Sequence, residues 1–141
     1  MKRLWLLLYS YYKKMYKRAV ECDFDCLKKL ADYYNNKGKY HKALKWYIYG
    51  AQNQDAECMR QVCLQVMSSH LFYPEDKRES IVILALYWAE KYKDACKTDN
   101  NEEQIEYSEN LNTTVKKMVA AYVLKSHSFP DDFNIITVPS I

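Results

Sequence analysis

The scarcity of glycine and proline constrains the fold of this chain more than any other feature. Only two glycines and three prolines occur among 141 residues, while hydrophobic residues make up 49% and charged residues 28%. Such a chain has too few turn-forming residues for a β-sandwich and too much apolar content for intrinsic disorder or collagen. It is long enough to bury its own core without metals or disulfides. The sequence therefore predicts one domain that is mostly helical.

Apolar residues at helical spacing, separated by capping residues and polar breaks, predict about six helices. These cover residues 3–20, 24–36, 40–52, 56–72, 77–96 and 102–126. Asp23 or Asp25 can cap the second helix and Asp55 the fourth, while Gly38 can end the second with a positive φ. The apolar run 81–86 predicts that the fifth helix is covered on more than one side. We expect a single domain over residues 1–126 and an extended tail over 127–141.

The first helix follows a short apolar run that looks superficially like a signal peptide. No small-x-small cleavage site follows the run, and it is too short to span a membrane. We therefore expect residues 3–20 to be a helix of the mature protein, and the protein to be cytoplasmic. An amphipathic helix lying on an anionic membrane is the alternative interpretation. That helix would use Trp5 and a basic cluster made of Lys13, Lys14, Lys17 and Arg18.

Charge is distributed unevenly along the chain. Residues 1–50 hold 12 Lys and Arg against 4 Asp and Glu, a net charge of +8, whereas residues 51–141 hold 9 against 14, a net charge of −5. The simpler interpretation is two solvated sets of helix faces of different sign. The alternative is that each part attracts a partner of the opposite charge.

The cysteines and histidines do not form a recognisable reactive site. Five cysteines, an odd number, stand among apolar helical positions without metal-ligand spacing, so we expect free buried thiols in a reducing compartment and no metal. Cys58 with His70, or Cys22 with His41, lacks a third residue that would orient the base. The sequence predicts no catalytic activity, no cofactor and no small-molecule substrate.

A faint internal repeat joins two of the predicted helices. Ala43-Leu44-Lys45-Trp46-Tyr47 recurs as Ala85-Leu86-Tyr87-Trp88-Ala89, an offset of 42 residues. Small alanines permit close approach of two helices, and a tryptophan three residues later fills the gap between neighbouring hairpins. We therefore expect Trp46 and Trp88 to be buried in equivalent positions.

Residues 26–57 resemble the Sel-one-like repeat family, which is related to the tetratricopeptide repeats. The resemblance rests on Leu30-Ala31-Asp32-Tyr33-Tyr34, on Gly38, and on the segment 42–56, which begins Lys42-Ala43-Leu44-Lys45-Trp46-Tyr47. Departures from the family pattern are Ala31 for a glycine, Gly50 for an alanine and Gln54 for a glycine. The resemblance implies an all-α, right-handed stack of helical hairpins, an α-solenoid, that binds proteins and has no catalytic role.

In such a stack, the first helix of each hairpin lines the concave surface, and its outward residues are candidates for partner binding. The predicted partner-binding residues are Lys28, Lys29, Tyr33, Asn36, Arg60, Gln61 and Gln65. We expect a protein partner that is acidic and docks on the first half, as an immunity or inhibitor protein or a secretion chaperone would bind its target. The alternative function is nucleic-acid binding through the basic, tyrosine-rich first half.

Overall fold

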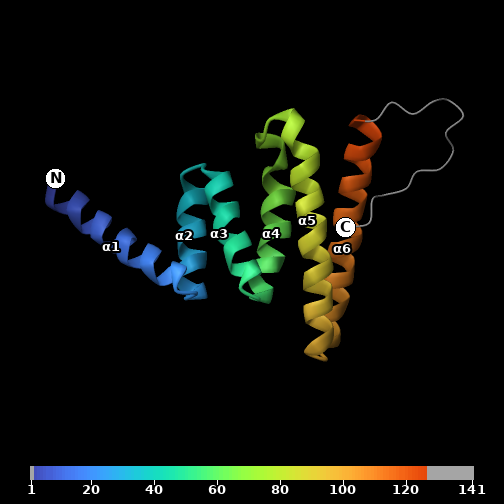
Figure 1. The fold of residues 1–141 in the computed structure, drawn as a ribbon, viewed down its shortest axis with the longest axis horizontal. Helices are drawn as coiled ribbons and strands as arrows, with labels where there is room; N and C mark the ends of the chain where they lie inside the picture. The colour runs from blue at the N-terminus through green and yellow to red at the C-terminus, as the bar shows by residue number, and fades with distance from the viewer. Residues whose placement is uncertain (1, 127–141) are drawn as a thin grey trace, which may run out of the picture. The chain divides into compact units, whose positions relative to one another are not determined.

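The structure is a computed structural model that describes residues 2–126, and these residues are almost entirely helical (Figure 1). The predicted all-α fold class is confirmed, since this part of the chain contains helices and no strand. The helices are α1 (Lys2–Val20), α2 (Phe24–Asn36), α3 (Tyr40–Gln52), α4 (Ala56–Ser69), a 3₁₀ helix η1 (His70–Phe72), α5 (Glu75–Thr98) and α6 (Glu102–Ser126). The predicted extended tail lies outside the described residues.

The observed bounds of α2, α3 and α6 equal the predicted ones. Helix α1 begins one residue earlier and α5 ends two residues later than predicted, and the other differences occur around Pro74. The fourth predicted helix ended at residue 72, but α4 ends at Ser69 and its last residues form η1. Arg78 holds this turn, because its Nε and Nη2 donate to the carbonyl oxygens of Tyr73 and Leu71 at 2.9 and 3.0 Å. The next helix, α5, begins directly after Pro74, two residues earlier than predicted.

The chain divides into two compact units, residues 1–58 and 59–141, which are described separately below as unit 1 and unit 2. Unit 1 contains α1, α2, α3 and the first residues of α4. Unit 2 contains the rest of α4, then η1, α5 and α6. The single domain expected over residues 1–126 stays a prediction.

In unit 1, neighbouring helices pack through small and aliphatic residues. Helix α2 contributes Leu27, Leu30 and Ala31 to the core, and α3 contributes Ala43, Leu44, Tyr47, Gly50 and Ala51. Met15 and Ala19 are the buried residues from the second half of α1. This packing leaves the described side chains of the first half of α1 exposed, where the ribbon runs away from α2 (Figure 1).

The three helices of unit 1 end in the same way. Cys22, Gly38 and Gln54 each have a positive φ, of 65°, 74° and 72°, and each is the second residue after the end of α1, α2 or α3. At each end the amide of the following residue donates to a carbonyl five residues back, as Lys39 does to Tyr34 at 2.8 Å. This is the Schellman arrangement, which satisfies the last carbonyl groups of a helix. Gly38 was the predicted member of this set, and Gln54 fills the place where the family has a glycine.

Two helices also begin in the same way, 32 residues apart. The side chain of Asp23 accepts a hydrogen bond from the amide of Cys26 at 3.3 Å, and Asp55 accepts one from Cys58 at 3.0 Å. Both caps belong to an Asp-x-acidic-Cys sequence, and each satisfies a free amide at the start of a helix. The sequence around the starts of α2 and α4 therefore repeats at an offset different from the 42 residues predicted.

In unit 2, α5 is covered on two sides, as its apolar sequence predicted. The Cys63 thiol of α4 donates to the carbonyl oxygen of Ala85 at 3.4 Å, and Lys116 of α6 forms an ion pair with Glu90 at 3.4 Å. Trp88 is buried, in line with the prediction.

Trp46 does not have the burial that was predicted for it. Its side chain is only partly covered, and its neighbour Tyr47 is buried in its place, 4% exposed, with its hydroxyl donating to Asp32 at 3.3 Å. The predicted equivalence of Trp46 and Trp88 is therefore wrong. Both Ala-Leu-x-Trp segments bury their alanine and leucine, but the buried aromatic residue is Tyr47 in α3 and Trp88 in α5.

Candidate functional site

Two of the four predicted binding residues of α2 are engaged within unit 1. Lys28 forms an ion pair with Asp55 at 3.8 Å. The ring of Tyr33 packs against that of Tyr12 with 4.2 Å between centroids, which makes it part of the α1–α2 interface. Lys29 and Asn36 are exposed, as the prediction required.

The predicted binding residues of α4 are less exposed than expected. Gln65 is buried, only 7% exposed, which contradicts its assignment to an outward face. Gln61 is partly covered. The guanidinium of Arg60 lies 5.8 Å from the centre of the Tyr107 ring of α6. Positions of α4 that looked outward in sequence are therefore covered in the fold.

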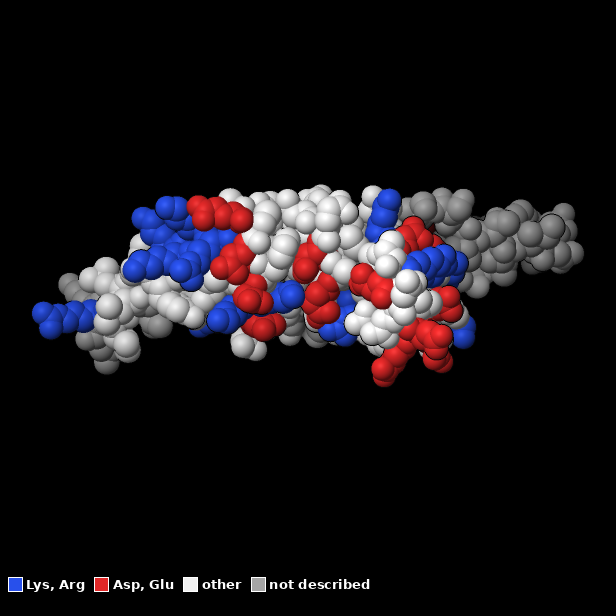
Figure 2. All heavy atoms as spheres, turned by 90° about the horizontal axis from the view of Figure 1, so that it is seen from below, with Lys and Arg blue, Asp and Glu red and all other residues white. Residues whose placement is uncertain are grey.

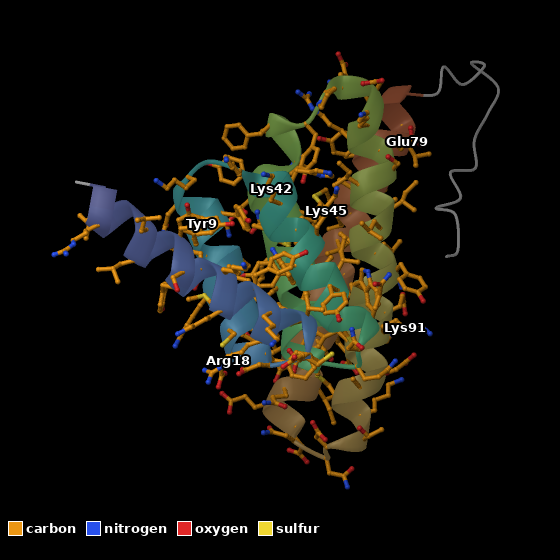
Figure 3. The ribbon with its side chains drawn as sticks, turned by 60° about the vertical axis from the view of Figure 1, so that its left-hand side comes forward. Tyr9, Arg18, Lys42, Lys45, Glu79 and Lys91 are labelled. Carbon is orange, nitrogen blue, oxygen red and sulfur yellow. The ribbon has the colours of Figure 1, made fainter. Side chains whose placement is uncertain are left out.

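The structure instead reveals a pocket in unit 1 that is lined by aromatic rings and two lysines, called here the aromatic pocket. It has a volume of about 330 Å³. Its lining comes from three helices and consists of Tyr16, Val20, Tyr34, Lys42, Lys45, Trp46 and Tyr49. Figure 3 shows Lys42 and Lys45 one turn apart on α3.

Perpendicular ring contacts give the aromatic pocket its shape. The Trp46 ring meets Tyr16 with 5.1 Å between centroids and an interplanar angle of 85°, and it meets Tyr49 at 6.1 Å and 87°. Tyr49 is fixed in turn, because its hydroxyl donates to the carbonyl oxygen of Val20 at 2.5 Å. Edge-to-face packing is a favoured geometry for aromatic pairs. The rings therefore form a corner in which an apolar side chain of a ligand can rest.

Two ammonium groups border this corner. The Lys42 Nζ lies 5.6 Å from the centre of the Tyr34 ring, within the range of a cation–π contact. Lys45 is exposed on the next turn of α3. An aromatic corner beside two cations is suited to a side chain that carries, or stands next to, a carboxylate.

A second pocket, called here the basic pocket, lies between α1 and α2. Its volume is about 480 Å³. It is lined by Tyr11, Lys14, Met15, Lys17, Arg18, Glu21, Cys26 and Lys29, so that four cations face one carboxylate. Figure 2 shows Lys and Arg side chains gathered on the surface of this part of unit 1, and Figure 3 labels Arg18 near the end of α1. The basic pocket has the charge to hold an anion.

The thiols have the environment of structural rather than reactive cysteines. Cys58, Cys63 and Cys96 are buried, and Cys22 and Cys26 are partly covered. Burial raises the pKa of the Cys63 thiol to about 12 and also raises the pKa of Cys58, which disfavours the nucleophilic thiolate at neutral pH. No group of three or more potential metal ligands comes together within residues 2–126.

The aromatic pocket was missed in sequence because Trp46, whose ring contacts Tyr16 and Tyr49, had been assigned to the core. The signal that could have revealed it is the surplus of large rings around Trp46, since Tyr47 and Tyr49 follow on the same helix and a single helix cannot bury all three. The first helix, whose contribution of Tyr16 and Val20 completes the pocket, lies outside the segment that resembles the repeat family.

Comparisons with protein-family models, with curated proteins and with solved structures found no match to this chain. Within the described part of the chain, none of the helices combines the length and apolar character needed to cross a bilayer.

Proposed function

We propose that this protein is a non-catalytic binding module whose unit 1 takes an acidic segment of a partner protein. The observation that carries the proposal is the aromatic pocket, in which a corner of tyrosine and tryptophan rings is bordered by Lys42 and Lys45. Tryptophan, tyrosine and nearby cations are the residue types that dominate the binding energy of protein interfaces. The partner segment places an aromatic or aliphatic side chain in the corner and acidic side chains beside the two lysines.

The repeated helix starts and the common helix ends of unit 1 support a repeat scaffold of the Sel-one-like kind. In such scaffolds, the hairpins supply a rigid frame and the side chains between them supply recognition. An immunity protein or a secretion chaperone is the kind of role that this scaffold and an acidic target would suit. The net positive charge of the first half of the chain would accelerate the encounter.

Nucleic-acid binding is the competing function, because lysines and aromatic rings also bind single strands. Base stacking requires open and roughly parallel ring faces, whereas Trp46 stands nearly perpendicular to both Tyr16 and Tyr49. The geometry of the aromatic pocket therefore favours a protein side chain over a stack of bases.

A selection of random peptides displayed on phage against the whole chain tests the proposal directly. We expect enrichment of peptides in which an aromatic or aliphatic residue is flanked by Asp or Glu. Replacing Trp46 by Ala should weaken the binding of the selected peptides by about 2 kcal/mol, roughly a thirtyfold loss of affinity, because a central aromatic contact is lost. Reversing Lys42 and Lys45 to Glu should mainly slow association and reduce its salt dependence.

The matched control is reversal of Lys91 and Lys97 to Glu, two exposed lysines of unit 2. Circular dichroism should show the same helix content in every variant. Selection of peptides without acidic residues, or equal losses from the control and from the Lys42 and Lys45 variant, would refute the proposed site. Tight binding of single-stranded oligonucleotides that depends on Trp46 would favour the nucleic-acid function instead.

A further inference from the structure

One face of α1 carries a stripe of exposed side chains that the fold does not use. Leu4, Leu7, Tyr11, Lys14 and Arg18 follow one another at intervals of three and four residues, which places them on one side of a helix. All five are exposed, and the first three are 65%, 68% and 54% exposed. Two exposed leucines one turn apart need an explanation, because such surface costs free energy in water.

The residues that attach α1 to unit 1 lie beside the stripe, and Met15 shares the lining of the basic pocket with Tyr11, Lys14 and Arg18. Met15 and Ala19 are buried, and the ring of Tyr12 packs on Tyr33. The five side chains of the stripe stay exposed next to this contact, so they are accessible to another surface.

The stripe changes in chemical character along the helix axis. Its first two members are aliphatic, the third is a tyrosine and the last two are cations. With a rise of 1.5 Å per residue, Leu4 and Tyr11 stand about 10 Å apart along the axis, and Tyr11 and Arg18 stand about 10 Å apart again. Aliphatic, aromatic and cationic groups succeed one another in this order between the acyl chains and the phosphates of a bilayer.

The charge of α1 is of one sign only. Residues 1–20 contain six Lys and Arg and no Asp or Glu. The cationic end of the stripe opens into the basic pocket, to which Lys14, Arg18 and Lys29 contribute. This pocket, of about 480 Å³, is large enough for a phosphorylated lipid headgroup.

We propose that α1 binds the surface of an anionic lipid bilayer. Leu4 and Leu7 enter the boundary of the acyl chains, Tyr11 lies at the level of the glycerol groups, and the basic pocket receives lipid phosphates. Arg3 stands beside Leu4, and its long side chain reaches the phosphates while its aliphatic stem lies among the acyl chains. This attachment goes beyond protein binding by the aromatic pocket, since the five residues of the stripe are absent from the lining of that pocket.

Two other occupants fit the stripe less well. A second copy that paired α1 with α1 would bring two helices of uniformly positive charge together. A nucleic acid would neutralise the cations but offer no complementary surface to the leucines. An anionic bilayer satisfies both ends of the stripe.

Flotation of the whole chain with unilamellar vesicles tests the proposal. Vesicles of phosphatidylcholine alone are compared with vesicles of equimolar phosphatidylcholine and phosphatidylserine. We expect binding to the anionic vesicles, little binding to the zwitterionic ones, and weaker binding as salt is raised.

Two pairs of substitutions separate the parts of the stripe. Leu4→Gln with Leu7→Gln should lower the partition coefficient about a hundredfold, since each buried leucine contributes roughly tenfold or more. Lys14→Gln with Arg18→Gln should lower it about thirtyfold, because each cation near an anionic surface contributes about fivefold. The matched controls are Leu71→Gln, at a leucine of η1 that is 64% exposed, and Lys117→Gln, at an exposed lysine of α6.

The proposal is overturned if the chain fails to float with anionic vesicles. It is also overturned if the leucine pair has no more effect than Leu71→Gln, since adsorption would then be electrostatic only. A dimer in sedimentation velocity that the leucine pair dissociates, without vesicle binding, would assign the stripe to a second copy. If the chain does not bind vesicles but is retained on single-stranded DNA, and the leucine pair does not change that retention, the cations of the stripe would be assigned to nucleic-acid binding.

Discussion

Replacing Gly50 by alanine tests the packing of unit 1 most directly, because a methyl group at this position would meet atoms of Cys58 and Leu27. Gly50 lies in the last turn of α3 and is buried. A methyl group there would overlap the sulfur of Cys58 and would lie 3.0 Å from the Cys58 Cβ and 3.3 Å from the Leu27 Cδ1. Carbon atoms in favourable contact are about 3.5–4.0 Å apart.

Two effects of opposite sign determine the expected change in stability. Alanine stabilises a helix relative to glycine by about 0.5–1 kcal/mol. Overpacking a buried contact costs about 1–3 kcal/mol. Because the methyl group meets atoms of two residues at once, we expect the second effect to prevail, with a net loss of about 1–2 kcal/mol in the free energy of unfolding.

Urea unfolding followed by far-UV circular dichroism measures this change. Cys58→Ala removes the overlapping sulfur, so Gly50→Ala should cost about 1 kcal/mol less in that background, a coupling of the size seen for residues in contact. Ala121→Gly, at an exposed position in α6, is the control. It measures the difference in helix propensity between alanine and glycine where no packing contact changes. If Gly50→Ala stabilised the protein by the full helix-propensity difference, the close contact of α3 with Cys58 would be refuted.

Three further predictions concern tryptophan, thiols and pH. Trp88→Ala should destabilise the protein by about 3–5 kcal/mol, as expected for a buried tryptophan, and Trp46→Ala by clearly less, when both are compared by urea unfolding. Cys22 should react with a thiol reagent before Cys63, whose pKa of about 12 and burial should protect it until denaturant is added, and mass spectrometry of labelled peptides gives the order. Burial lowers the pKa of His70, with the charge of Arg78 as a further cause, so the native state holds this proton less tightly than the unfolded state. Stability should therefore fall as pH decreases from the usual value of 6.5 through the lowered native pKa, and His70→Asn should reduce that fall in urea titrations.

The sequence alone determined the fold class and most of the helix boundaries. Local interactions fix these features: a carboxylate one residue before a helix satisfies its free amides, and Gly38 adopts the positive φ that ends α2 without steric cost. Helix α3 was predicted to its last residue, although Gln54 rather than a glycine adopts the positive φ of 72° that ends it. The sequence also contains the repeated helix starts at Asp23 and Asp55, but the longer alanine and tryptophan pattern predicted a different offset.

Only the tertiary structure decided which side of each helix is covered. Trp46 and Tyr47 are adjacent and both are suited to a core, and the placement of α1 against α2 and α3 makes one of them pocket lining and the other core. Gln65 looked outward because it is polar, yet neighbouring elements bury it. Helical periodicity gives the angles between residues on one helix, but the direction of the core is set by contacts between residues far apart in sequence, which no local pattern encodes. For the same reason the aromatic pocket, built from three helices, became visible only in the folded chain.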